Sequence, residues 1–522
     1  MRQPSSPAAG RVNLAAMSRD LSPAHSGLSS GAKSPIAGPS LAAPPMPARS
    51  PGSVADDAAV ESDVKSTLTT AGSISKRPLI GKRHASTRSD ASGLLPSEPG
   101  SHPDSPLPPP SPGSDSEEDT YPEGGLRAWL IVFGSWLALF ASLGLMNVMA
   151  TFDTYLSARH LVDHDNGTVG GIISLYTILS FTLGIYVGPV FDKHGPRWPI
   201  VGGSVCLFAA LIVVSISTNY WHLLVAFAVF SGLGSALLFT PSIAAIGHFF
   251  NERRGLATGV ATTAGSVSAV VFPYVVQELF VMIGWPWTMR ALALICLGVA
   301  VGANFLIRSR LPPAKHAKIT PSVRVFQTKG FGLTLGAVFL MQFAGFVPLS
   351  YLSGYVLAKG FGQEFSFDVV TVLNASSAFG RVAGGWLGDW VGVYNANVVF
   401  SVVASIACFA VWLPVEEGKA GMIGFAVLFG FTSGSNVSLM PVTVGKLCGT
   451  REYGRYYGTV YTIVSLGVLV AIPIAGKLVL GSKGSWDGLI VLTGVAYLAS
   501  AVVFAVAKMS IVGWRSKPWV IF

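Results

Sequence analysis

The sequence predicts an all-α membrane protein with twelve transmembrane helices arranged as two six-helix bundles. Of the 522 residues, 51% are hydrophobic and only 12% are charged, whereas an ordinary soluble protein has roughly 25% charged residues. The apolar residues gather in runs of about 20, the length of helix that spans a bilayer. These runs fall into two halves that repeat one another in sequence. The composition therefore excludes a soluble globular enzyme and a secreted domain.

Residues 1–120 precede the first apolar run, and we expect them to form a disordered cytoplasmic tail. They are rich in Ser, Pro, Gly and Ala, so they have too little apolar surface to offset the entropy lost on ordering. No apolar core of a secretory signal occurs near the start. Residues 1–126 carry 11 basic and 13 acidic side chains. Several Ser-Pro pairs and the acidic run 114–119 are candidate phosphorylation sites.

Twelve apolar segments follow, and the longest connection, residues 308–330, separates the sixth from the seventh. We therefore expect a first bundle over 121–310, a cytoplasmic linker over 311–330, and a second bundle with a short cytoplasmic tail over 331–522. The segments are, in order, 127–152, 168–190, 198–217, 221–247, 255–280, 286–307, 331–357, 367–390, 394–414, 420–447, 454–480 and 486–510.

Lysine and arginine are unevenly distributed over the connections, and this asymmetry predicts the topology. If the amino terminus is cytoplasmic, the connections on that side and the carboxyl-terminal end carry sixteen Lys and Arg residues. The opposite side then carries only Arg159, Lys359, Lys419 and Lys483. We therefore expect a multi-pass protein of the cell membrane with both termini in the cytoplasm. The basic excess sets topology in the lipid bilayer, and nucleic acid is not an expected partner.

The two halves repeat in sequence. At an offset of 200, five identities recur in spans 4–5 and 10–11: Gly234/Gly434, Ser235/Ser435, Pro241/Pro441, Glu252/Glu452 and Pro273/Pro473. At an offset of 197, the pattern Gly188, Asp192 and Gly195 recurs as Gly385, Asp389 and Gly392. Repeated six-helix halves are typical of transporters in which one bundle rocks against the other around a central site.

Three motifs carry a family resemblance. The segment Gly188-Pro-Val-Phe-Asp-Lys-His-Gly-Pro-Arg197 resembles the loop motif of the major facilitator superfamily. Residues 123–129 (EGGLRAW) and 249–259 (FFNERRGLATG) are similar to two signatures of the monocarboxylate transporter family in its fungal form, and they enter spans 1 and 5 as expected. The resemblance covers about residues 120–515. It implies the two-bundle fold and transport of a small substrate.

The loop motif predicts a gate at the cytoplasmic end of the bundles. Asp192 can cap the amino terminus of a neighbouring helix or pair with a basic residue such as Arg197. Gly188 and Gly195 permit close helix approach and a tight turn. In the second copy Asp389 persists, but Trp390 and Tyr394 replace the basic residues Lys193 and Arg197, so we expect a weaker latch. Three further residues are expected at this inner gate: Glu252, Arg253 and Arg254.

Arg381 is the most informative residue for substrate binding. It lies near the middle of span 8 between apolar neighbours, where a charge costs at least about 2.5–3.5 kcal/mol on insertion scales and normally faces a cavity. Asn374 and Ser377 precede it at helical spacing and place a polar stripe on one face. A guanidinium binds a carboxylate through two parallel hydrogen bonds. In the resembled family an Arg of span 8 holds the substrate carboxylate, and Arg381 occupies that position. A structural Arg that ties helices together is the alternative.

Two departures from the animal lactate carriers concern protons. Those carriers have an Asp one turn before the Arg, where this chain has Ser377, and a Lys in span 1, near Met146 and Asn147. The resemblance implies that the Lys, Asp and Arg together carry the proton. Proton coupling by that route is therefore not expected, although protons remain a possible second partner.

Other polar residues within the spans are weaker candidates for lining the cavity, and contacts between helices are the alternative for each. They are Asn147, Gln342, Asn436, Tyr457 and Tyr461. No ATP-binding motif, hydrolase motif or cluster of metal ligands occurs, so we expect no cofactor, no metal and no enzymatic activity.

The leading interpretation is a secondary active or facilitated transporter of a small organic anion across a fungal membrane by alternating access. The anion is a monocarboxylate, a dicarboxylate such as itaconate, or an acidic secondary metabolite. Export is favoured, because cells that make such acids in the cytoplasm must release them. Uptake of a monocarboxylate or of a vitamin such as riboflavin is the alternative within transport. A non-transporting nutrient sensor is the alternative from another class, and the long tail would suit it.

Overall fold

The computed structural model describes residues 121–159, 166–311, 320, 329–415, 418–481 and 485–513. The expectations for the tail over 1–120, for most of the linker and for the carboxyl-terminal end beyond Gly513 lie outside these residues. Within them, the chain is built from helices alone, as the sequence predicts.

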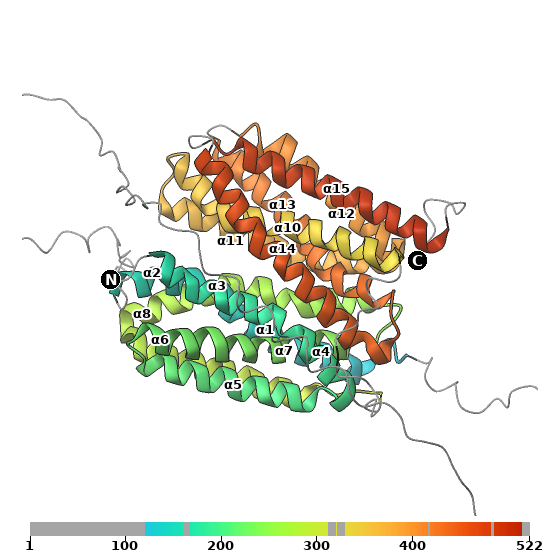
Figure 1. The fold of residues 1–522 in the computed structure, drawn as a ribbon, viewed down its shortest axis with the longest axis horizontal. Helices are drawn as coiled ribbons and strands as arrows, with labels where there is room; N and C mark the ends of the chain where they lie inside the picture. The colour runs from blue at the N-terminus through green and yellow to red at the C-terminus, as the bar shows by residue number, and fades with distance from the viewer. Residues whose placement is uncertain are drawn as a thin grey trace, which may run out of the picture. The chain divides into compact units, whose positions relative to one another are not determined.

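The first half contains the helices from α1 to α8, which form one group in Figure 1, coloured from blue to green. Spans 2 and 4 are each built from consecutive shorter helices, and part of span 4 is π-helical. The elements are α1 (Gly125–Asn147), α2 (Met149–Arg159), α3 (Asn166–Thr182), α4 (Gly184–His194), α5 (Arg197–Ile216), α6 (Tyr220–Leu223), η2 (Leu224–Ser231), α7 (Gly232–Ile246) and α8 (Arg254–Leu306).

The second half contains the helices from α10 to α15, coloured from yellow to red in Figure 1. The elements are α10 (Lys329–Ala358), α11 (Gln363–Val391), α12 (Val393–Ile406), η3 (Ala407–Trp412), α13 (Lys419–Gly445), η4 (Thr450–Glu452), α14 (Tyr453–Gly481) and α15 (Asp487–Val512).

The twelve predicted spans are all helical. Ten helical stretches of the described chain are long and apolar enough to cross a membrane. One of them, α8, carries spans 5 and 6 together, because the chain turns at Gly284 (φ 70°) without the separate loop that the sequence suggested. Span 8 is α11, which is not among the ten. Its Asn, Ser, Gly and charged residues lower its hydropathy, and these same residues made it the candidate for substrate binding.

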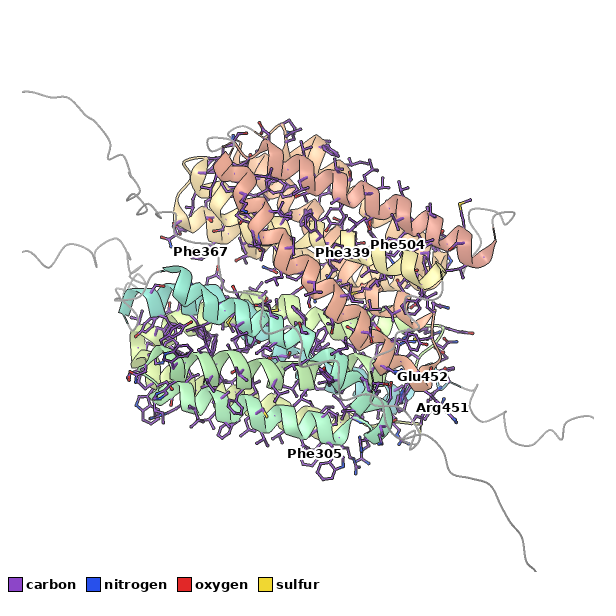
Figure 2. All side chains as sticks on the ribbon, in the orientation of Figure 1. Phe305, Phe339, Phe367, Arg451, Glu452 and Phe504 are labelled. Carbon is purple, nitrogen blue, oxygen red and sulfur yellow. The ribbon has the colours of Figure 1, made fainter. Side chains whose placement is uncertain are left out.

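Large apolar side chains cover the outside of the bundle, as expected of a surface that faces lipid. Phe305 and Phe367 are 72% and 46% exposed, and Figure 2 shows Phe305 pointing away from the helices. Phe504, by contrast, is fully buried. Apolar exposure of this extent has no place on a soluble protein, so the chain is a multi-pass membrane protein.

The two halves meet through glycines at one end of the bundle. Gly188 of α4 lies against the backbone of Gly454 in α14, and Gly385 of α11 lies against the backbone of Gly255 in α8. A Cβ at any of these glycines would overlap the opposing backbone or side chain. This arrangement lets two pairs of helices approach closely across the halves, and Figure 1 shows α14 running down to α4. We call this region the latch end.

Candidate functional site

A cavity of about 140 Å³ lies between the two halves and is lined by residues of both. Six of the seven predicted substrate-binding residues line it: Arg381, Asn374, Ser377, Asn147, Gln342 and Tyr461. The seventh, Asn436, is buried within α13 and does not line the cavity. The adjacent residue Val437 takes the cavity-facing position instead, because neighbouring residues on a helix point about 100° apart.

Arg381 reaches the cavity from α11 and makes one hydrogen bond across the halves. Its Nη1 donates to the backbone carbonyl of Thr262 in α8. Its Nε is buried and has no hydrogen-bond partner. Gly265 leaves room for the guanidinium, because a Cβ there would lie 2.8 Å from Nη1. Among the described residues that line the cavity, Arg381 is the only charged one.

The polar stripe around Arg381 also contributes contacts between helices. Ser266 of α8 donates to Ser377 of α11 across 3.3 Å, which joins the two halves beside the cavity. Asn147 donates to the carbonyl of Gly265 at 2.9 Å and to the hydroxyl of Ser268 at 3.1 Å. Asn147 thus serves both alternatives left open by the sequence, since it lines the cavity and ties α1 to α8.

Aromatic side chains form much of the remaining wall, and most of them could not be predicted from the sequence. Tyr457 was a candidate, but Phe181, Phe239, Phe346 and Tyr497 were not, although all of them line the cavity. In an apolar span a Phe that faces lipid and a Phe that faces a cavity look the same. Only the phase of each helix against its neighbours could have separated the two.

Asp192 at the end of α4 binds the amino terminus of α14 in the other half. Its carboxylate accepts hydrogen bonds from the backbone amides of Gly454, at 2.9 Å, and Arg455, at 2.7 Å. The structure therefore has the helix cap rather than an ion pair with Arg197, which is exposed. Gly195 ends the helix with φ 78°, a left-handed conformation that glycine adopts at little cost.

Asp389 at the end of α11 makes the equivalent contacts to the first half. Its carboxylate accepts from the amides of Gly255, at 2.7 Å, and Leu256, at 2.8 Å, at the start of α8. This contact does not support the expectation of a weaker second latch, because it has the same number of hydrogen bonds as the first. The expectation rested on the loss of two basic side chains, whereas the carboxylate binds backbone amides that any sequence supplies.

Arg254 packs against the second half at the same end. It is 6% exposed, and its guanidinium carbon lies 4.2 Å from the centre of the Tyr453 ring. Glu252 and Arg253, the two other residues expected at the inner gate, have exposed side chains. Their contribution to the latch end comes from their backbone amides, which bind a residue that the sequence did not single out.

That residue is Glu123, which lies just before α1. Its carboxylate accepts from the amides of Asn251 at 2.7 Å, Glu252 at 2.8 Å and Arg253 at 3.1 Å. Two residues earlier, the Tyr121 hydroxyl lies 2.6 Å from the Thr450 hydroxyl of the second half. The entry to α1 therefore connects both halves at the latch end. The motif at residues 123–129 contains this carboxylate, but no pattern in the sequence indicated that it binds the backbone amides of residues 251–253.

His248 lies beneath this junction, in the connection between α7 and α8. It is 6% exposed, and its Nδ1 lies 2.8 Å from the Ser309 hydroxyl. Burial and the nearby charges of Arg254 and Arg310 lower the pKa of His248 to about 4. The imidazole is thus neutral at physiological pH. No group of three or more candidate metal ligands occurs in the part of the chain that the structure describes.

A membrane bundle of two repeated six-helix halves around a central cavity has the architecture of a secondary transporter. The family model described as Major Facilitator Superfamily matches residues 128–448, and the chain belongs to this superfamily. It is therefore a transporter of a small substrate rather than an enzyme.

Individual proteins are similar over most of the chain. The fujikurins efflux protein of Gibberella fujikuroi is 32% identical over 407 residues, which cover 76% of this chain and 86% of that protein. The riboflavin transporter MCH5 of Saccharomyces cerevisiae is 30% identical over 440 residues, 78% of this chain and 84% of that protein. The human organic anion transporter MFSD10 shares the fold, with a TM-score of 0.62 at 13% identity over 73% of this chain and 100% of that chain.

Proposed function

We propose that this transporter carries a small organic anion, whose carboxylate binds Arg381 in the cavity between the halves. The observation that carries the proposal is the buried Nε of Arg381, which has no hydrogen-bond partner and belongs to the only charged residue that the described cavity lining contains. A buried donor left without a partner costs about 1–3 kcal/mol, and more when it is charged. A carboxylate supplies both the acceptor and the opposite charge.

We propose that alternating access involves the breaking and forming of the two latches. The bonds from Asp192 and Asp389 hold one end of the bundle together, so the described conformation is the one in which that end is closed. Rocking the halves apart would break both latches and open the cavity to that side. We further propose that the latch end faces the cytoplasm and that both termini lie there, on the strength of the sixteen Lys and Arg residues predicted for that side.

Export is the proposed direction, and it is supported by the similarity to a protein named for efflux of fujikurins. Membership of the monocarboxylate transporter family, in its fungal form, is part of the same proposal. It rests on the signatures at residues 123–129 and 249–259. No carboxylate or histidine is among the described residues of the cavity lining. The proposed transport therefore does not include a proton-carrying side chain in the cavity.

Counterflow in liposomes tests the anion proposal. The purified protein is reconstituted into vesicles loaded with an unlabelled acid, and entry of the labelled acid is measured for itaconate, lactate and other carboxylates. We expect counterflow for at least one acid, with competition by carboxylates and none by the corresponding amides. Equal competition by acids and amides would contradict the proposal. A non-transporting sensor would show no counterflow with any compound.

Uptake of riboflavin is the second candidate, because a named riboflavin transporter is 30% identical to this chain. The same vesicles separate the two candidates. Counterflow of labelled riboflavin that benzoate and itaconate do not inhibit would favour a vitamin carrier over an anion carrier.

A further inference from the structure

Four aromatic side chains form a continuous cluster on one wall of the cavity, which we call the aromatic wall. Phe181 of α3 and Phe239 of α7 come from the first half, and Tyr457 and Tyr461 of α14 come from the second. The ring centre of Tyr461 lies 5.4 Å from that of Phe181, 5.0 Å from that of Phe239 and 5.1 Å from that of Tyr457. The two halves therefore build one aromatic surface.

The rings are arranged in the geometries that aromatic groups prefer. Phe181 and Phe239 meet edge to face, with an interplanar angle of 82°, and Phe239 and Tyr457 are nearly parallel at 23°. Pairs of this kind contribute stability beyond the area that they bury, because the positive edge of one ring meets the negative face of another. A ring that enters the cavity would extend this packing, whereas an aliphatic chain of the same size would gain only burial.

Polar groups lie next to the aromatic wall. Arg381 and Tyr461 both line the cavity, so the guanidinium and the aromatic wall border the same space. The side chain of Tyr457 is buried, and Nε of Arg381 is buried and has no hydrogen-bond partner. Both residues line the cavity. A ligand with an acidic group would satisfy the buried donor of Arg381.

The size of the cavity sets the scale of the ligand. Its volume of about 140 Å³ is close to that of an apolar protein cavity, about 150 Å³, that holds one benzene ring. Asn147, Gln342 and Arg381 line the same cavity as the aromatic wall. The cavity therefore matches a molecule that is acidic on one side and flat on the other.

From this juxtaposition we infer that the substrate is an aromatic or otherwise flat, conjugated acid of about one ring, and that the aromatic wall selects the ring. The inference rests on the proposed function, since the acid group is the part that binds Arg381. Short aliphatic acids such as lactate would bind Arg381 but leave the aromatic wall uncovered, so they would be poor ligands.

A matched set of ligands tests the inference on the intact protein. Binding of benzoate, cyclohexanecarboxylate and benzamide to the purified wild-type transporter is measured by isothermal titration calorimetry at neutral pH. Benzoate and cyclohexanecarboxylate are both ionised and differ in the ring, whereas benzoate and benzamide differ in the charge. We expect benzoate to bind about tenfold more tightly than cyclohexanecarboxylate, and benzamide to bind more weakly than either acid.

Two variants assign the effects to residues. Phe239→Leu should bring the affinities for benzoate and cyclohexanecarboxylate to within about threefold of each other, because it removes one ring of the aromatic wall. Arg381→Ala should weaken binding of both acids more than binding of benzamide. If Phe239→Leu does not fold, the ligand comparison on the wild type still decides the question.

The outcomes separate the inference from the proposed function. Equal affinities for benzoate and cyclohexanecarboxylate in the wild type, both lost in Arg381→Ala, would overturn the preference for rings and leave the anion proposal standing. Benzamide binding as tightly as benzoate would overturn the anion proposal. Binding of itaconate with no binding of benzoate would overturn the inference, and binding of none of these acids would contradict both.

Discussion

Asp192 and Asp389 make the same contact from opposite halves of the molecule. Each ends its own helix and accepts hydrogen bonds from two consecutive backbone amides at the start of a helix in the other half. Asp192 thus caps α14 and Asp389 caps α8, where the positive end of each helix dipole favours a negative charge. The internal repeat of the sequence appears in space as two equivalent latches.

Because the two latches are equivalent, Asp192→Asn and Asp389→Asn should loosen the latch end to a similar degree. Each variant loses charge-assisted hydrogen bonds, which contribute about 1.5–3 kcal/mol each. Cys448 reports the opening, because burial raises the pKa of its thiol to about 12 in the closed conformation and the thiolate is the reactive form. We expect thiol labelling of Cys448 to accelerate by about tenfold or more in both variants.

The buried thiols of Cys296 and Cys408 provide the control, because they become labelled only if the helices themselves unfold. Asp389→Asn is the decisive variant, because the charge of Asp192 also acts directly on the Cys448 thiol. A normal labelling rate for Cys448 in Asp389→Asn would mean that the second latch does not hold this end closed. Unchanged rates in both variants would mean that the carboxylates do not hold this end closed.

Gly188→Ala should prevent the latch end from closing. The added methyl group would overlap the backbone carbonyl of Gly454, and a backbone cannot rotate away as a side chain can. Gly298→Ala is the matched control, since nothing lies within 4 Å of a Cβ at that exposed helical position, and alanine there should stabilise the helix by about 0.5–1 kcal/mol. We expect rapid Cys448 labelling and strongly reduced counterflow for Gly188→Ala alone. Wild-type labelling and counterflow in Gly188→Ala would show that α4 and α14 can accommodate a methyl group at this position.

Glu123→Gln should weaken the attachment of the chain to the α7–α8 connection. A carboxylate that accepts three amide hydrogen bonds becomes a neutral amide with one accepting oxygen. The melting temperature of the purified protein should therefore fall, by an amount equivalent to about 1.5–3 kcal/mol. Glu278→Gln, at an exposed position in α8, controls for the loss of a negative charge. An equal effect of the two substitutions would contradict a specific role for Glu123.

The contribution of His248 to the stability of the protein should be lost as the pH drops from about 6.5 toward 4. Its pKa is lowered to about 4 in the folded protein, below the value of about 6.5 in an unfolded chain. The folded state therefore binds fewer protons in this interval, and the stabilisation is complete above pH 6.5 and is lost as the pH falls. At pH 5 the loss from this group is about 2 kcal/mol at most.

Melting temperatures of wild type and His248→Asn at pH 7.5 and pH 5 isolate this contribution, because the other titrating groups are common to both. Asparagine keeps a polar atom near the Ser309 hydroxyl but does not titrate. We expect acidification from pH 7.5 to pH 5 to lower the melting temperature of the wild type relative to that of the variant. An identical decrease would mean that His248 is accessible to protons in the folded state.

The sequence was sufficient for the fold because twelve apolar runs and their charged connections follow directly from the chemistry of a bilayer. It also located Arg381, since a charge within an apolar run has few explanations. The spans 5 and 6 were less well predicted, because a single glycine at position 284 replaces the expected loop. Composition does not reveal how short a turn can be.

The site residues that the sequence missed share a physical reason. Phe181 and Phe239 line the cavity but are indistinguishable in sequence from phenylalanines that face lipid. The partners of Asp192, Asp389 and Glu123 are backbone amides, which every residue except proline possesses. Such contacts depend on which helix ends meet, and therefore on the packing of the halves rather than on residue type.

Arg381 is the proposed ligand of the substrate carboxylate. Arg381→Ala should lower the affinity for carboxylate ligands at least about tenfold, since hydrogen bonds to charged groups contribute about 1.5–3 kcal/mol. Arg381→Lys should restore little of it, because an ammonium group cannot reproduce the two parallel bonds of a guanidinium. Arg290→Lys is the control, since Arg290 contacts Ser215 and Trp287 and does not line the cavity.

Titration of the three purified variants with the labelled acid that shows the strongest counterflow tests this claim most directly, with the melting temperature recorded for each. We predict normal affinity for Arg290→Lys and loss of binding for both Arg381 variants. The melting temperatures should show that all three variants are folded at the temperature of the titration. Wild-type affinity in folded Arg381→Ala would contradict the claim. Arg381 would then be a structural residue that ties α11 to the Thr262 carbonyl.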